Sequence, residues 1–163
     1  MKQQSTAIAS RLPSSPDRSL GEWEALMRKA VTTMRKTGIA AAAADCDTAL
    51  AIARRLIDTP PPGREEDCIA ALVVSHHNLA DVKMACGEFD AAAGVLCQAH
   101  EALAATLQDA GRSTSIRQAA LRHMRETHYA LVAHVGAHGP HPLIARALCS
   151  GVLALDADDP TRH

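Results

Sequence analysis

The order of apolar and polar residues predicts α-helices along most of the chain. Apolar residues recur at steps of three and four, a spacing that places them on one face of a helix. In the first such segment, residues 19–37, this face carries Trp23, Leu26, Met27, Ala30, Val31 and Met34. Asp17 or Ser19 can cap its start, and Gly38 can adopt the left-handed conformation that often ends a helix.

The same spacing predicts five further helices, separated by prolines and glycines. The expected ranges are residues 39–57, 65–86, 89–110, 115–135 and 142–155. The prolines of DTPPPG, residues 58–63, end the second helix because proline lacks the backbone donor. A turn at residues 136–140 precedes the last helix. Short connections pair helices into antiparallel hairpins, so the sequence predicts three hairpins in an all-α domain at residues 19–156. Flexible tails are expected at residues 1–18 and 157–163.

Composition supports this interpretation and excludes several classes of partner. Hydrophobic residues make up 47% of the chain, but it has one Trp, one Tyr and one Phe, so Ala and Leu supply the core of helices rather than sheets. A net charge of −1 argues against binding to nucleic acid. No apolar run is long enough for a membrane span, and no secretory signal is recognised. The five cysteines indicate free thiols, so a cytoplasmic protein is expected.

The segment around Gly87 carries the most specific pattern in the chain. It reads HHNLADVKMACGEFDAAAGVLCQAHEAL, with a Leu-small pair before the glycine and an aromatic residue two positions after it. Small and large apolar residues follow at helical spacing, at Ala92, Leu96 and Ala99. This segment resembles a tetratricopeptide repeat.

The resemblance implies that the three hairpins stack as a right-handed superhelix of six helices. The turn glycines Gly38, Gly87 and Gly139 are about 50 residues apart, compared with roughly 34 in the standard repeat, so longer helices are expected. The first helix of each hairpin would line the concave face, where the family binds peptides or partner helices. The resemblance places on that face Arg28, Thr32, Arg35, His77, Asp81, Met84 and Tyr129.

A protein with such a groove is expected to act as an interaction module: an adaptor, a regulatory subunit or a small chaperone. Arg28 and Arg35 would make one end of the groove basic, which suits an acidic segment or a C-terminal carboxylate. A solvated helix face is the simpler interpretation of both arginines. The family's carboxylate clamp uses Lys and Asn at inward positions where this chain has Thr32, His77 and Asp81. Binding of a chaperone tail is therefore not expected.

The nine histidines and five cysteines suggest an alternative function, a metal- or redox-responsive regulator. His134 and His138 are four residues apart, and Cys97 and His100 are three apart, so either pair could share a helix face. No carboxylate or cysteine completes either set, and a helix that ends near Gly136 would separate the first pair. Packing roles are therefore expected, without a metal ion or cofactor.

No pattern in the sequence predicts catalysis. The glycines do not form a loop that would cradle phosphate, and no nucleophile is grouped with a base. The last expected helix is strongly apolar, through Leu143, Ile144, Leu148, Val152 and Leu153. A homodimer that buries this face is a third hypothesis, compatible with either function.

Overall fold

The computed structural model describes residues 16–157, and every regular element in this part of the chain is a helix. The helices are α1 (Pro16–Thr37), η1 (Ile39–Ala42, a 3-10 helix), α2 (Ala43–Asp58), α3 (Glu65–Ala85), α4 (Phe89–Gln108), α5 (Thr114–His138) and α6 (Pro142–Ala157). The predicted all-α class and the six α-helices are confirmed. Residues 16–18, expected in the N-terminal tail, belong to α1, and residue 157 belongs to α6. The rest of both expected tails, residues 1–15 and 158–163, lies outside the described residues.

Two helix boundaries differ from the prediction, each for a local reason. The second helix does not begin at residue 39, because residues 39–42 form η1. Ala42 offers no side-chain cap to α2, and the tighter 3-10 turn pairs the Ala41 N–H with the Gly38 carbonyl at 3.3 Å. The fifth helix does not end at residue 135. It continues through Gly136 to His138, because the positive φ that ends it, 91°, belongs to Gly139.

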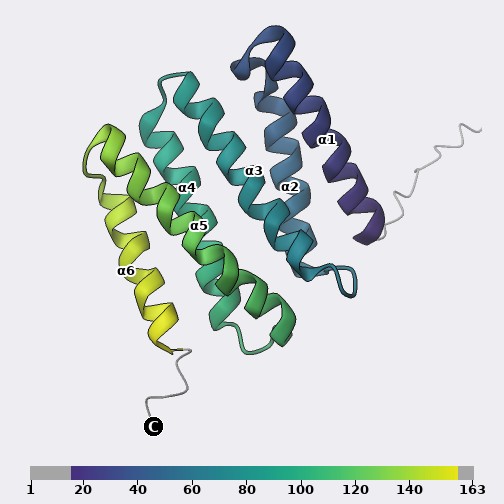
Figure 1. Ribbon diagram of the computed structural model, residues 1–163, viewed down its shortest axis with the longest axis vertical. Coiled ribbons are helices and arrows are strands. Elements are labelled where there is room, and N and C mark those ends of the chain that lie inside the picture. Colours follow the sequence, from purple (N-terminus) through teal and green to yellow (C-terminus); the bar gives the residue numbers. More distant parts are fainter. Residues whose placement is uncertain (1–15, 158–163) are drawn as a thin grey trace, which may run out of the picture.

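In Figure 1, α1 lies at one side of the molecule and α6 at the other, and α5 crosses in front of α4. Each of the first five packs against the next, and α3 also contacts α5. The central helix is α4, which contacts α3, α5 and α6, and α6 packs more extensively on α4 than on α5. At the other end, the Trp23 indole N–H donates to the Ser75 hydroxyl at 2.8 Å and links α1 to α3.

The buried apolar residues form two clusters that differ in side-chain size. The large core cluster extends from α1 to α5 and is filled mainly by Leu, Ile and Val, including Leu50, Ile52, Leu56, Ile69, Leu72, Val73, Leu103, Leu107 and Ile116. The alanine-rich cluster joins α3, α4, α5 and α6 through Ala80, Ala92, Ala93, Leu96, Cys97, Leu131, Ile144 and Ala147. Both α4 and α5 contribute one half of their length to each cluster.

A buried polar pair lies where the two clusters meet. His100 of α4 and Thr127 of α5 are hydrogen-bonded, with 2.8 Å between Nδ1 and Oγ1. The Thr127 hydroxyl donates to the Met124 carbonyl, so it accepts from a protonated His100 Nδ1. The other ring nitrogen, His100 Nε2, faces Gly151 of α6, where a Cβ atom would lie only 2.2 Å away. Glycine is therefore the residue that lets α6 pack closely on the ring.

Candidate functional site

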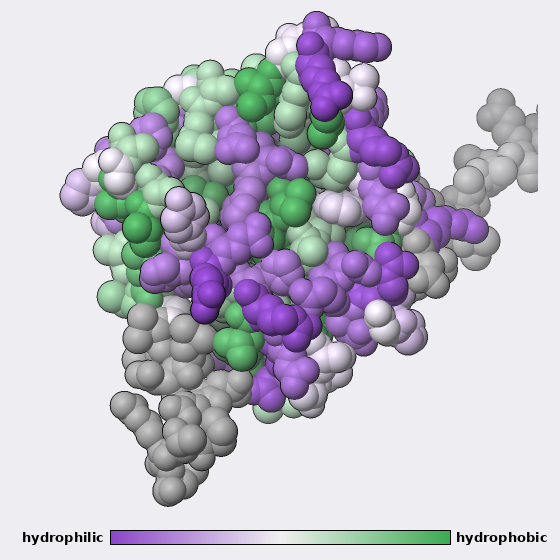
Figure 2. All heavy atoms as spheres, in the orientation of Figure 1, coloured by the Kyte–Doolittle hydropathy of each residue, from purple (hydrophilic) through white to green (hydrophobic). Residues whose placement is uncertain are grey.

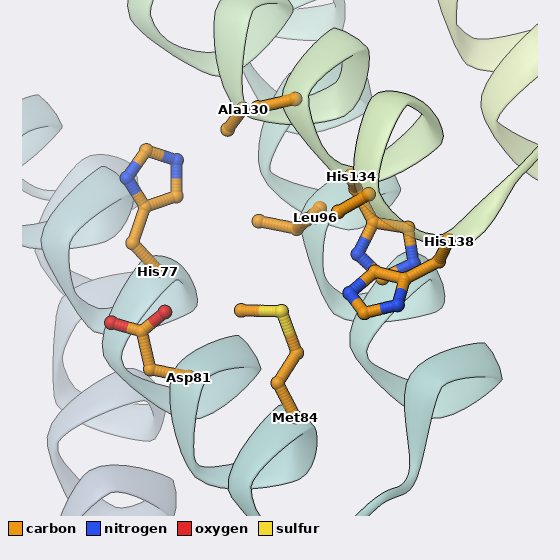
Figure 3. Close-up of a pocket in the computed structure, with 9 residues that line it drawn as sticks. His77, Asp81, Met84, Leu96, Ala130, His134 and His138 are labelled. Carbon is orange, nitrogen blue, oxygen red and sulfur yellow. The ribbon is translucent and has the colours of Figure 1, made fainter.

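A pocket of about 320 Å³ lies between α3 and α5. Its lining residues come from three helices and are His77, Asp81, Met84, Leu96, Ala130, Ala133, His134, Ala137 and His138. Figure 3 shows His77 and Asp81 on one wall and the rings of His134 and His138 on the opposite wall, with Leu96 between them. The pocket is thus polar on two sides and apolar inside.

Helical spacing places each set of lining residues on one face. His77, Asp81 and Met84 are four and three residues apart on α3, so they project from the same side. On α5, small alanines alternate with two histidines over residues 130–138. The space exists because alanine side chains end at Cβ, whereas leucines at these positions would fill it.

On the face shown in Figure 2, hydrophilic residues are interleaved with apolar ones and gather most densely over α1 and the lower half.

The α3 wall presents two hydrogen-bond acceptors to the pocket. The Nδ1 atom of His77 lies 3.7 Å from a carboxylate oxygen of Glu126, and its Nε2 atom is buried without a hydrogen-bond partner among the described residues. Burial lowers the pKa of His77, although the charges of Glu126 and Asp81 oppose this. Burial also raises the pKa of Asp81, and the His77 charge opposes it. At neutral pH a neutral imidazole therefore stands beside a carboxylate.

A chain of ion pairs holds Glu126 next to His77. His123 places Nδ1 at 3.1 Å from Glu126 and Nε2 at 3.0 Å from Glu66. The Arg122 guanidinium donates to Glu66, at 2.9 Å from Nε, and this contact holds the pKa of Glu66 below its usual range. Glu66 and His77 belong to α3, whereas Arg122, His123 and Glu126 belong to α5. The network therefore joins the two helices that form the pocket walls.

The α5 wall contains the most deeply buried polar group of the pocket. His134 is only 5% exposed, and its Nδ1 atom is buried without a hydrogen-bond partner among the described residues. Its ring lies 4.6 Å from that of His138, which in turn stacks on Phe89 at 4.4 Å. Burial, followed by the charges of His138 and His141, lowers the pKa of His134. The Asp90 charge opposes this shift.

Of the seven residues expected in a groove, three come together in this pocket. His77, Asp81 and Met84 line it, whereas Tyr129 belongs to α5 but does not line it and is 74% exposed. Because Tyr129 directly precedes Ala130, its side chain projects in another direction around the helix.

The other three expected groove residues lie on α1 and do not line the pocket. Arg28, Thr32 and Arg35 are all exposed. The Arg28 guanidinium is 3.9 Å from Glu24, one turn earlier, and the Thr32 hydroxyl donates to the Arg28 carbonyl at 2.9 Å. These local contacts fit a solvated helix face.

Sequence reasoning did not assign His134 and His138 to the pocket. It expected the helix to end near Gly136, which would have separated the two histidines. Since α5 runs to His138, they share one helix face, and their spacing of four residues was the signal that could have identified them.

The described histidines, cysteines and carboxylates do not form a group of three or more that could hold a metal ion. Cys46, Cys68 and Cys97 are buried, and burial raises the pKa of Cys97 to about 11, which keeps it a weakly nucleophilic thiol. Cys86 and Cys149 are exposed. The pocket itself contains no cysteine, so its residues offer hydrogen bonding and apolar contact.

Within residues 16–157, none of the helices has the length and apolar content that crossing a bilayer requires.

Comparisons with known proteins identify a family but no characterised relative. No curated protein and no solved structure matches the chain. A family model described as "Protein of unknown function (DUF2753)" matches residues 21–163, so the chain belongs to this family.

Proposed function

We propose that this protein is an interaction module that binds a segment of another protein in the pocket between α3 and α5. Its hairpins would stack in the manner of tetratricopeptide repeats. The contacts of α3 with α5 and of α4 with α6 support this arrangement, because they join equivalent helices of successive hairpins. The pairs α1–α2, α3–α4 and α5–α6 would then be the repeating units.

The observation that carries the proposal is the combination of open apolar space with unpaired polar atoms. A volume of about 320 Å³ is near the lower limit of ligand pockets and suits one or two side chains of a peptide. Buried nitrogens of His77 and His134 face this space without a hydrogen-bond partner among the described residues. Buried polar atoms are normally paired, so a partner that supplies hydrogen bonds would complete the site.

The residue types in the pocket favour binding over covalent catalysis. None of the nine residues that line it is a serine, threonine, cysteine or lysine, the usual nucleophiles. Three histidines and one carboxylate, without a hydroxyl, thiol or amine nucleophile among the lining residues, suit recognition of a partner.

Filling the pocket is the direct test of this function. Ala133 lines the pocket and is exposed, so Ala133→Leu would occupy the space without disturbing the core. Ala51→Leu on the exposed surface of α2 makes the same change elsewhere. We expect quantitative affinity purification from the native host to recover the same partners with wild type and Ala51→Leu, and to lose them with Ala133→Leu. Equal recovery with all three proteins would show that the pocket is not the binding site.

The arginines of α1 are tested separately, because they do not line the pocket. If the bound segment extends across α1 and is acidic there, Arg35→Glu will reduce its recovery while Ala133→Leu abolishes it. Full recovery with Arg35→Glu would confine the contact to α3, α4 and α5. The proposal of an acidic segment depends on this variant alone.

A further inference from the structure

We infer that the pocket accepts a basic side chain, an arginine or lysine of the partner protein, with its cation held at Asp81 and His77. This inference rests on the proposed function and specifies the residue that anchors the partner. It follows from the hydrogen-bonding capacity of the two walls, from the apolar interior and from the charge around the pocket.

The α3 wall offers acceptors that match a cation. A separation of 3.7 Å is too long for a hydrogen bond, but the negative charge of Glu126 favours the His77 tautomer with its proton on Nδ1. The buried Nε2 atom then carries a lone pair. In Figure 3 the His77 ring stands at the rim with one nitrogen toward the pocket interior. Asp81, one turn further along α3, adds an exposed carboxylate at the edge of the pocket, which attracts a cation whose N–H groups can pair with the buried His77 nitrogen.

The opposite wall supplies an independent indication that the pocket suits a polar ligand. His134 is 5% exposed and lines the pocket, and its Nδ1 atom has no hydrogen-bond partner among the described residues. An arginine has five N–H donors spread over a planar group, and a lysine has three. A ligand of this kind can reach acceptors that are set apart, whereas a metal ion needs ligands that converge on one point.

The interior of the pocket suits the stem of a long basic side chain. Met84, Leu96 and the three alanines of α5 are apolar, and the methylene groups of lysine and arginine pack well on such surfaces. None of the nine lining residues is a lysine or arginine that would repel the cation.

Other anchors fit less well. An acidic side chain would face Asp81, with Glu126 close behind His77, and would be repelled. A purely apolar side chain would leave the buried nitrogens of His77 and His134 unpaired. Charge complementarity therefore selects a basic residue.

The two histidines make this binding sensitive to acid. Both are neutral near pH 7 and accept hydrogen bonds, but protonation turns each into a cationic donor that repels the ligand. Because burial lowers the pKa of both rings, affinity should fall only as the pH drops below the ordinary histidine value of about 6.5. The titratable groups that act on the two rings are Glu126 and Asp81 for His77, and His138, His141 and Asp90 for His134.

The test uses simple probes that differ only at the end of the side chain. Isotope-labelled full-length protein is titrated with the N-acetyl, N′-methylamide derivatives of lysine and arginine, and with the neutral counterparts norleucine and citrulline. We expect the basic probes to shift amide resonances of residues 77–84 and 130–138 and to bind roughly tenfold or more tightly than the neutral ones. Asp81→Asn should remove most of this preference, and Asp47→Asn, an exposed position on α2, should retain it.

Two results would overturn the inference. One is equal binding of the norleucine and lysine probes at the pocket, and the other is the absence of localised shifts with both basic probes at tens of millimolar. Neither result decides the proposed function, because loss of partners on Ala133→Leu is measured independently. If Ala133→Leu loses partners while the basic probes fail, the pocket binds a partner through a different residue.

Discussion

The two buried clusters differ in the size of their side chains. The cluster of large residues is closely filled, whereas the pocket lies beside the cluster of small residues. In the large core cluster, Leu, Ile and Val fill the space. A buried histidine of α3, one of the helices that build this cluster, has a partner for each ring nitrogen. That residue, His76, has Nδ1 at 2.8 Å from the Leu72 carbonyl and Nε2 at 3.5 Å from Arg54. Beside the alanine-rich cluster, a pocket remains open and His134 has an unpaired nitrogen.

The difference indicates that binding capacity arises where packing is incomplete. Large side chains fill space and exclude water, which stabilises the fold but leaves no room for a ligand. Alanines allow helices to approach closely at one level and leave a hollow between α3 and α5 at another. We therefore expect substitutions in the first region to change stability, and substitutions at the pocket to change binding.

The strongest test compares two leucines. Leu72 is fully buried in the large core cluster, and Leu72→Ala should cost about 3 kcal/mol of unfolding free energy because it leaves a closed cavity. Leu96 borders the pocket, so Leu96→Ala enlarges a space that already exists and should cost about 2 kcal/mol, near the lower limit for such changes. Urea denaturation measures both. A larger loss for Leu96→Ala would break the comparison.

Acid should destabilise the fold through histidines buried in their neutral form. Burial lowers the pKa of His76 to about 4, whereas an unfolded chain has a histidine pKa near 6.5. The folded state thus binds fewer protons, so its stability is full above pH 6.5 and falls as the pH drops toward 4. The loss from His76 should be between about 2 and 3 kcal/mol at pH 4.5.

His76→Gln provides the control for this acid effect. Glutamine cannot take up a proton, so the difference in unfolding free energy between pH 7.5 and 4.5 should shrink in this variant. An unchanged difference would assign the acid sensitivity to other groups, among them His77, His100 and His134, whose pKa values are also lowered by burial.

The contact between α6 and the His100 ring is tested by Gly151→Ala. The added Cβ would lie 2.2 Å from Nε2, and the ring is held by Thr127, so the variant should lose about 1 to 2 kcal/mol. This loss remains although alanine favours a helix by up to about 1 kcal/mol. In a His100→Ala background the clash is absent, so Gly151→Ala should become neutral or stabilising. Thermal denaturation of the four proteins gives the coupling, and additive effects would contradict the contact.

The smallest expected effect on stability is at the pocket itself. Asp81 is exposed and has no side-chain hydrogen bond to another residue within residues 16–157, so Asp81→Asn should change the unfolding free energy by less than about 0.5 kcal/mol. The same variant should lose its preference for basic probes. Denaturation and titration of one sample test both statements. A destabilised Asp81→Asn protein would show that the carboxylate has a structural role.

Most of the fold follows from local patterns, and the exceptions have local causes. The starts of α3 and α4 agree with the prediction, and α5 begins with a local cap, in which the Ser113 side chain accepts from the Ile116 N–H at 3.4 Å. The predicted end of α5 was wrong because Gly136 and Gly139 cannot be told apart by residue type. Only the backbone conformation shows that Gly139 is the glycine with a positive φ. Nothing in the sequence distinguishes η1 from the start of α2.

The site was predicted on one wall only. The resemblance to tetratricopeptide repeats gave His77, Asp81 and Met84 as inward positions of one helix, and their spacing places them on one face of α3. The opposite wall depends on how α5 is rotated against α3, which is set by contacts between distant segments, such as the Glu66–His123 pair. Local periodicity contains no information on that rotation, so His134 was interpreted as a packing residue.

The contact between Gly151 and His100 also fixes the position of α6 along its axis. A shift of α6 by one turn toward its C-terminus would bring Ala147 against the ring, where its methyl group would take the place that the glycine leaves empty. The imidazole therefore opposes movement of α6 along its axis in that direction. Because α6 is held mainly by α4, this contact acts together with the buried Ile144 and Ala147 to set the position of the last helix along the bundle.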